Sequence, residues 1–191
     1  LGNGSNDNLM FVAQTFLHPG SECLFTEYSF AVYPIMTQLM GAKIVNTPLK
    51  NWQADLDALL EAITAKTRVV YFANPNNPTG TYTPIDKLVI DEAYYEYCTQ
   101  LNDYDSALSL IGTYPNVIVT RTFSKIYGLA GLRVGYSISH PALAETFNRI
   151  RQPFNVNRLS LVAAKAALND QAFIDASITV NTSGLAQLER F

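Results

Sequence analysis

Apolar and polar residues alternate along this chain in blocks that predict strands and helices in turn. Short apolar runs, such as 22–27 and 116–123, have the length and composition of buried strands. Between them, apolar residues recur with helical spacing. This alternation predicts an α/β fold with a mainly parallel sheet and helices on both faces. Strands are expected over 22–27, 42–48, 67–74, 87–90, 116–123 and 133–139, and helices from a cap at Ser5 or Asn6 to about Leu17 and over 30–40, 55–65, 105–110, 141–150, 159–168 and 171–178.

Composition narrows the class of protein. Hydrophobic residues make up 48% and charged residues 15%, which is typical of a globular chain with a core. The net charge is −3 and no basic cluster is present, so we expect no nucleic acid partner. The apolar runs are strand-sized, so neither a membrane span nor a signal peptide is expected.

The cysteines and histidines exclude further kinds of site. Cys23 and Cys98 are isolated in the sequence, which favours a reducing cytoplasm over a disulfide scaffold. His18 and His140 each precede a proline, and neither has the spacing of a metal ligand. We therefore expect no metal site and no catalytic histidine.

The ends of the chain and one internal link predict that residues are absent. The chain opens on Leu1 without an initiator Met and stops within a helical pattern. The link between the strands expected over 67–74 and 87–90 has several prolines and no helical periodicity. Parallel strands need a crossover of about a dozen residues or more, usually helical. We expect either missing residues around Pro84 to Asp86 or an unusual direct connection.

Four polar segments lie where a parallel sheet binds ligands. Each alone has an ordinary interpretation as a turn, a helix cap or a solvated lysine. In open α/β sheets, however, ligands sit outside the carboxyl ends of the strands. Taken together, the segments predict one site at that edge. They are 2–7, 74–80, 91–94 and 122–133.

Two of these segments carry candidate reactive groups. Asp91 ends an apolar run and presents a carboxylate that suits a cationic ring nitrogen. Lys125 follows the strand expected to end at Phe123, and its amine, when neutral, can attack an aldehyde.

The other features suit an anion. Arg133 supplies a charge suited to a phosphate dianion. The loop over 2–6, which opens a helix, presents free backbone N–H groups to an anion. Gly128 and Gly131 are expected to turn the backbone so that Lys125 and Arg133 meet at one site.

The motifs resemble the signature segments of a known family. Asn74-Pro-Asn-Asn-Pro-Thr-Gly80, Asp91-Glu-Ala-Tyr-Tyr-Glu-Tyr97 and Thr122-Phe-Ser-Lys-Ile-Tyr-Gly-Leu-Ala-Gly-Leu-Arg133 are similar to those of pyridoxal-phosphate (PLP) aminotransferases of fold type I. The resemblance runs from Leu1 to Phe191 and is greatest to the histidinol-phosphate aminotransferases.

This resemblance implies a role for each site residue. Lys125 bonds the cofactor and moves a proton between the substrate Cα and the cofactor C4′. Asp91 pairs with the pyridine nitrogen and keeps it protonated, which makes the ring a better electron acceptor. Asn77 and Tyr94 donate to the phenolic oxygen, and Phe30 stacks on the ring unless it is an ordinary core aromatic. The phosphate contacts are Ser5, Asn6, Thr122, Ser124 and Arg133.

The resemblance also implies an activity and a domain organisation. It implies transamination between L-histidinol phosphate and 2-oxoglutarate, giving imidazole acetol phosphate and L-glutamate, in a cytoplasmic homodimer with its active site at the subunit interface. Residues 1–150 would form the PLP-binding large domain, and 151–191 a helical connection towards a small C-terminal domain. The family's N-terminal segment and the arginine that binds substrate are not in this chain.

Other functions stay open beside this one. Aromatic amino-acid aminotransferases and a cobalamin-pathway decarboxylase share the same segments. A PLP fold that serves as the sensor domain of a transcription regulator is a different class, and no helix-turn-helix pattern or basic region supports it. A nucleotide-binding domain would require a Gly-x-Gly-x-x-Gly turn after the first strand, which this sequence lacks.

Overall fold

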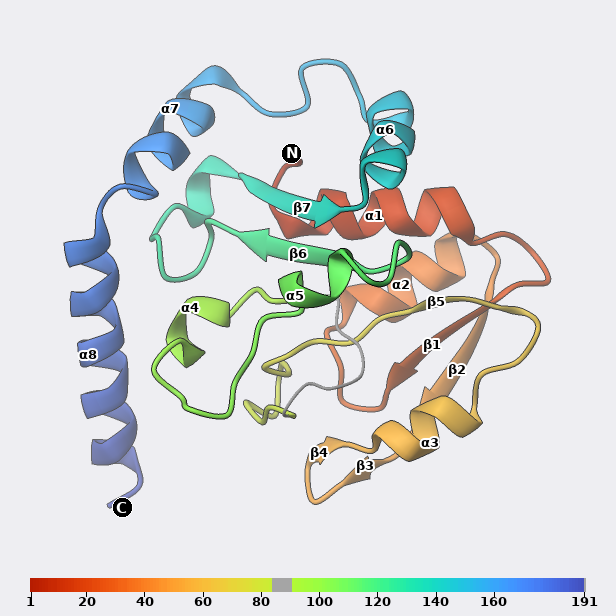
Figure 1. The fold of residues 1–191 in the computed structure, drawn as a ribbon, viewed down its shortest axis with the longest axis horizontal. Coiled ribbons are helices and arrows are strands. Elements are labelled where there is room, and N and C mark those ends of the chain that lie inside the picture. The colour runs from red at the N-terminus through yellow and green to blue at the C-terminus, as the bar shows by residue number, and fades with distance from the viewer. Residues whose placement is uncertain (84–90, 191) are drawn as a thin grey trace.

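The computed structural model describes residues 1–83 and 91–190 and has an α/β fold (Figure 1). Its strands are β1 (Glu22–Thr26), β2 (Lys43–Thr47), β3 (Leu49–Lys50), β4 (Gln53–Ala54), β5 (Thr67–Val70), β6 (Ile118–Thr122) and β7 (Gly135–Ser139). Three of them pair in parallel in the order β2-β1-β5. β6 and β7 pair antiparallel, and β3 and β4 form a short hairpin.

Asp91 joins the parallel strands to the antiparallel pair. It forms single parallel bridges with Ala73, just after β5, and with Thr120 in β6. The order across the sheet is therefore β2-β1-β5-Asp91-β6-β7, and among its described strands β7 alone runs antiparallel. This confirms the mainly parallel sheet. The strand expected over 87–90 and the gap expected around Pro84 to Asp86 lie outside the described residues.

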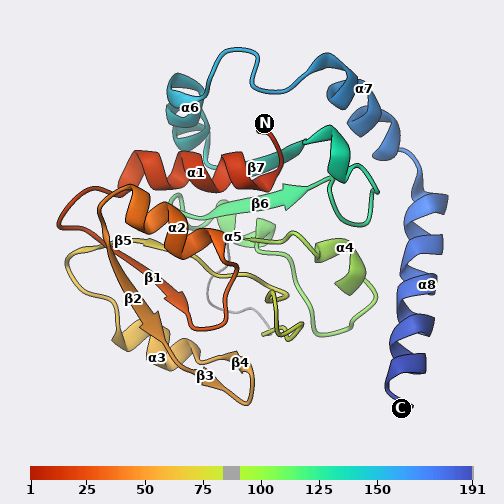
Figure 2. The same ribbon diagram turned by 180° about the vertical axis from the view of Figure 1, so that it is seen from behind.

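Helices cover both faces of this sheet. The helices are α1 (Ser5–Phe16), α2 (Val32–Leu39), α3 (Leu56–Glu61), α4 (Tyr95–Cys98), α5 (Leu108–Ile111), α6 (Pro141–Ile150), α7 (Arg158–Ala167) and α8 (Gln171–Leu188), with a 3-10 turn η1 at Ala130–Leu132. α1 packs along β5, β6 and β7, and α2 packs against β2, on the face turned to the viewer in Figure 2. α3 and α5 pack on the opposite face.

The core lies on both sides of the central strands. Every residue of β1 and of β6 is buried, as expected where both faces of a sheet are covered. Side chains of a strand alternate between the faces. Cys23 and Phe25 therefore pack beneath α1 and α2, whereas Leu24 packs on the other face with Leu59 of α3 and Val119 of β6.

A third cluster holds the loop that follows β6. Phe123 and Ile126 pack against Ala164 of α7 and Ile174 of α8. Lys125 lies between the two loop residues in sequence. Its backbone is therefore fixed from one side by the sheet and from the other by the last two helices.

The start of α1 differs from the expectation. The N-cap is Gly4, and no described side chain caps the helix, so the cap expected from Ser5 or Asn6 is wrong. Because neither side chain caps the helix, both can turn towards a ligand. α3 is shorter than expected, and Asp55 caps it by accepting from Ala58 N at 3.1 Å.

The hydrophobic pattern did not predict the β3–β4 hairpin or the full length of α8. The β3–β4 hairpin turns at Asn51 and Trp52, which both have positive φ, and its strands of two residues each are too short to show alternation. α8 continues to Leu188, ten residues beyond the expected end at Ile178. Its C-terminal half has mostly exposed side chains and therefore lacks a strong apolar stripe.

Three further features of the described residues concern membrane-spanning helices, metal-binding groups and disulfides. Within residues 1–83 and 91–190, no helix is both long and apolar enough to cross a membrane. In the same ranges, no group of three or more His, Cys, Asp or Glu side chains is arranged to hold a metal ion. Cys23 and Cys98 are both buried and carry free thiols.

Gly135 fixes the loop that opens α1 against β7. Gly2 and Gly135 exchange backbone hydrogen bonds of 3.0 and 3.1 Å. A Cβ at position 135 would lie 2.5 Å from Ser5 N and against the carbonyl carbon of Gly4.

We expect Gly135→Ala to lower the free energy of unfolding, measured in urea, by about 1–3 kcal/mol, because rigid backbone must move. Gly112→Ala is the control, since nothing lies within 4 Å of its added Cβ. Equal stability of the two variants would contradict this packing.

Candidate active site

All ten residues assigned to the cofactor by resemblance lie around one cavity. It has a volume of about 140 Å³ and opens at the carboxyl ends of β1, β5 and β6. The structure therefore brings together segments that are far apart in the sequence. Ala73, Pro75 and Ala93 also line the cavity. The ten expected residues are Ser5, Asn6, Phe30, Asn77, Asp91, Tyr94, Thr122, Ser124, Lys125 and Arg133.

Asp91 is the buried carboxylate of the cavity, with 4% of its surface exposed. Its Oδ2 accepts from the Tyr33 hydroxyl at 3.0 Å, and its Oδ1 accepts from Thr120 Oγ1 at 3.1 Å. Burial raises the pKa of Asp91, and these two hydrogen bonds offset part of that rise. A positive charge placed in the cavity would favour the ionised form.

Lys125 lies on the loop after β6 and reaches the same cavity. Its Nζ lies 5.0 Å from the centre of the Tyr94 ring. Asn77 Nδ2 donates to the Tyr94 hydroxyl at 3.5 Å, so an amide and a phenol stand together beside the lysine. The amine, the phenol and the amide are therefore available to one bound molecule.

In the loop after Lys125, only one of the two glycines has a positive φ. Gly128 has a φ of 67°, and its N–H donates to the Lys125 carbonyl at 2.9 Å. Gly131 lies within the tight turn η1 but has no positive φ, so its backbone conformation does not require glycine. Arg133 instead takes the left-handed conformation, with φ 53°, where a residue with a side chain is strained.

The guanidinium of Arg133 and the start of α1 form the cationic end of the cavity. Arg133 Nη1 donates to Ser124 Oγ at 3.2 Å and to the Ala130 carbonyl at 2.8 Å, and Nη2 donates to the Asn3 carbonyl at 3.4 Å. A Cβ at Gly4 would lie 2.5 Å from Nη2, so a side chain at position 4 would displace the guanidinium from this place. The uncapped N–H groups of the first helical turn add to a surface that suits an anion.

Two residues that contact the site were not anticipated from the sequence. Tyr33 and Thr120 hold the two oxygens of Asp91. Each had a signal in the sequence. Tyr33 follows Phe30 by three residues and therefore shares its side of a helical turn. Thr120 precedes Thr122 by two residues and therefore shares its face of a strand.

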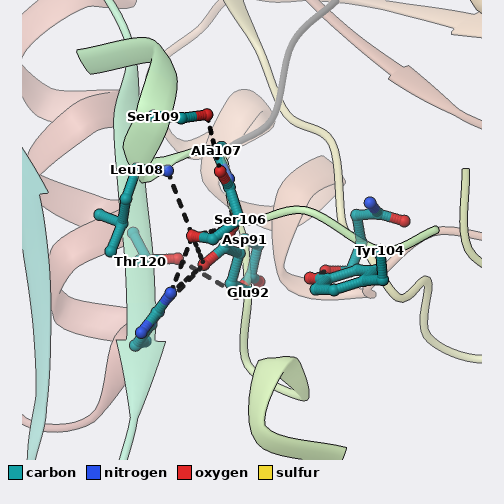
Figure 3. Close-up of polar contacts among 10 residues, drawn as sticks. Asp91, Glu92, Tyr104, Ser106, Ala107, Leu108, Ser109 and Thr120 are labelled. Carbon is teal, nitrogen blue, oxygen red and sulfur yellow. Dashed lines mark hydrogen bonds and ion pairs between the residues drawn. The ribbon is translucent and has the colours of Figure 1, made fainter. Parts of the chain in front are cut away.

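Behind Asp91 lies a buried ion pair. Glu92 is fully buried and accepts from Arg121 Nε at 3.0 Å and from Nη2 at 2.7 Å. Its oxygens also accept from the Ser106 hydroxyl at 3.0 Å and from the Ala107 N–H at 2.7 Å (Figure 3). The Arg121 guanidinium carbon lies 3.6 Å from the centre of the Tyr95 ring. The two charges thus compensate each other at a site where Glu92 is fully buried and Arg121 is mostly buried.

Strand alternation separates this ion pair from the site. Asp91 and Thr120 point to the cavity side, where they bond to each other. Their neighbours Glu92 and Arg121 point to the opposite face, where they also bond to each other. The segment Asp91–Glu92 is therefore joined to β6 on both faces of the sheet. These contacts fix the position and orientation of the Asp91 side chain.

The comparisons with known proteins identify the family. The model of the family "Aminotransferase class I and II" matches residues 1–191. Histidinol-phosphate aminotransferase 2 of Pseudomonas fluorescens (strain Pf0-1) is 51% identical over 202 residues, which cover 99% of this chain and 54% of that protein. Histidinol-phosphate aminotransferase 1 of Nitrosococcus oceani is 49% identical over 201 residues, covering 98% of this chain and 54% of the relative. The chain belongs to the class I and II aminotransferases.

A solved structure agrees in fold. Histidinol-phosphate aminotransferase from Sinorhizobium meliloti, determined in complex with pyridoxal-5'-phosphate, superposes with a TM-score of 0.86 at 32% identity. The match covers 93% of this chain and 52% of the other. This confirms the expected fold of PLP-dependent transferases of fold type I. The chain spans about half the length of the curated relatives that it matches.

Removing one partner of the buried ion pair leaves an uncompensated charge. We expect Glu92→Gln and Arg121→Met each to lower the free energy of unfolding by about 3–5 kcal/mol. The double variant should lose clearly less than the sum of the two, because neither member of the pair is then left charged without the other. Urea unfolding of the four proteins measures this coupling. Arg149→Ala, which removes one partner of the exposed Glu145–Arg149 pair, is the control and should change stability little. Strict additivity of the two buried changes would contradict the pairing.

Burial of Asp91 gives a pH-dependent effect on stability. Its raised pKa means that the folded protein holds this proton more tightly than the unfolded chain does. Ionised Asp91 therefore destabilises the fold above its ordinary pKa of about 4, and this penalty vanishes below that pH. We expect Asp91→Asn to raise the free energy of unfolding of the cofactor-free protein at pH 7, with the gain fading towards pH 3. Urea unfolding over this range measures it, and a loss of stability at pH 7 would contradict the assignment.

Proposed function

We propose that this chain binds PLP in the cavity and contributes the cofactor site of an aminotransferase that acts on L-histidinol phosphate and 2-oxoglutarate. The observation that carries the proposal is the arrangement around one cavity of a buried carboxylate, a lysine and a cationic end. A planar, charged cofactor with an aldehyde, a ring nitrogen and a phosphate has a complementary group for each.

The polar groups around the cavity match the polar groups of PLP along its whole length. Asp91 has both oxygens fixed by hydroxyl groups and still lines the cavity, which suits a protonated pyridine nitrogen. The phosphate suits the cationic end, where Gly4 leaves space for the Arg133 guanidinium. Tyr94 and Asn77 lie between these ends on the Lys125 side, where the phenolic oxygen would accept from them.

The residues of this chain would then carry out distinct tasks. Bound PLP supplies an aldehyde that bonds an amine and a ring that accepts electron density from the substrate Cα. Lys125 would hold the cofactor covalently and, once displaced by the substrate amine, would move a proton between Cα and C4′. Asp91 would keep the ring nitrogen positive, and Phe30 would cover one face of the ring. Ser5, Asn6, Thr122, Ser124 and Arg133 would anchor the phosphate.

The proposed substrate follows from the relatives. Curated relatives at about half identity over nearly the whole chain are named histidinol-phosphate aminotransferases. Their name supports transamination of L-histidinol phosphate in histidine biosynthesis. We also propose the homodimer and the cytoplasmic location that the resemblance implied. Two free, buried thiols are in keeping with a reducing compartment.

The proposed division into domains has support from the location of the site. Every residue that lines the cavity precedes residue 150. This supports a large domain over 1–150 and a connecting segment over 151–191, in which α7 and α8 support the loop that carries Lys125.

Absorbance spectroscopy of the intact protein tests the cofactor and the substrate together. We expect added PLP to give a yellow band, and L-histidinol phosphate to shift that band to the pyridoxamine form. Lys125→Ala should abolish the yellow band, because among the described residues that line the cavity Lys125 alone provides an amine. Lys66→Ala, which removes an exposed lysine that does not line the cavity, is the matched control and should behave like the unchanged protein.

Different outcomes contradict different parts of the proposal. A yellow band that responds to an aromatic amino acid but not to L-histidinol phosphate would overturn the substrate and keep the cofactor site. A band that survives in Lys125→Ala, or no band at all with added PLP, would overturn the cofactor site itself.

A further inference from the structure

Tyr33 of α2 is a fully buried residue that contacts the proposed site without lining the cavity. Its side chain has 0% exposed surface, and its hydroxyl donates to Asp91 Oδ2 at 3.0 Å. The bond joins residues 58 positions apart and is therefore a product of the tertiary fold. Because Thr120 holds the other oxygen, Tyr33 is one of two side-chain donors that fix the carboxylate in the described structure.

The ring of Tyr33 lies within a column of three aromatic side chains. Phe30 meets it edge-to-face, with ring centres 5.8 Å apart and an interplanar angle of 89°. Tyr71 stacks on it at 4.7 Å and 9°. The Tyr71 hydroxyl donates to the Leu9 carbonyl of α1 at 2.8 Å, which anchors the far end of the column. Tyr33 thus contacts both Phe30 and Asp91, two residues that line the cavity.

The Tyr33 hydroxyl stays protonated and so remains a donor. Burial, and next the charge of Asp91, raise the pKa of Tyr33 well above its ordinary value. A hydrogen bond donated to a carboxylate stabilises its ionised form. Loss of this donor would make Asp91 a stronger base and leave its carboxylate held by the Thr120 hydroxyl and the Ala93 backbone.

On the basis of the proposed PLP site, we propose that Tyr33 is a positioning residue for two cofactor contacts at once. Its hydroxyl fixes Asp91 opposite the ring nitrogen and keeps the shared proton on that nitrogen. Its ring supports Phe30 against the face of the cofactor. Tyr33 itself does not touch the cofactor in this arrangement, because Phe30 and Asp91 stand between it and the cavity.

Two tyrosines of the column give a matched pair of variants. Tyr33→Phe removes only the hydroxyl that Asp91 accepts from and keeps the ring in the column. Tyr71→Phe removes an equally buried hydroxyl whose acceptor is a backbone carbonyl away from the cavity. Both variants lose one buried hydrogen bond, so both should fold with a similar loss of thermal stability. A difference between them at the cofactor then reports on Asp91 and not on general destabilisation.

The test measures the ring nitrogen directly in the holoprotein. PLP labelled with 15N in the ring is added to the unchanged protein and to both variants, and the 15N chemical shift and the dissociation constant of PLP are recorded. In Tyr33→Phe we expect the shift to move towards that of neutral pyridine and the dissociation constant to rise on the order of ten-fold. In Tyr71→Phe we expect the shift to stay that of the unchanged protein and the dissociation constant to stay within about two-fold.

The outcomes separate this inference from the function on which it rests. A protonated ring nitrogen in the unchanged protein, with the same shift in Tyr33→Phe and Tyr71→Phe, would overturn the positioning role and leave the PLP site intact. A ring nitrogen that is neutral in the unchanged protein, or PLP that does not bind, would overturn the proposed site and this inference with it.

Discussion

A carboxylate buried at the centre of the sheet is the constraint on which this structure depends. Asp91 bridges Ala73 on one side and Thr120 on the other, so it lies where the parallel strands meet the antiparallel pair. Ionised in that position it opposes folding, and burial raises its pKa. The surrounding residues offset this penalty in part, through Tyr33 and Thr120. A cation in the cavity would offset it further, and this links the stability of the sheet to the ligand.

The two faces of the sheet carry different side chains of the same segments. One face carries the cavity, and the other carries the buried ion pair. On the face below α1 and α2, Asp91 lines the cavity and the Thr120 hydroxyl donates to its carboxylate. On the other face, Glu92 and Arg121 form a compensated pair next to α5. Because neighbouring residues of a strand point in opposite directions, one short segment serves both purposes. α7 and α8 then fix the loop that carries Lys125, so the amine is presented from a supported backbone.

Much of this arrangement could be predicted from sequence, and what could not has a physical reason. Strands such as β1 and β6 are continuous apolar runs, and the residues around the cavity lie in local motifs whose order along the chain is readable. The contact between Tyr33 and Asp91 depends on how α2 packs on the sheet, which no local pattern records. The start of α1 at Gly4 and the hairpin at Trp52 depend on backbone conformations with positive φ, which the pattern of apolar and polar residues does not record.

The most direct test of the central claim is to identify the residue that holds PLP. The intact protein is loaded with PLP, reduced with sodium borohydride so that the cofactor stays attached to its amine, digested and mapped by mass spectrometry. We expect the pyridoxyl phosphate group on the peptide that contains Lys125, at close to one group per chain, and not on other lysines. A label spread over exposed lysines such as Lys43 or Lys66, with Lys125 unmodified, would contradict the account.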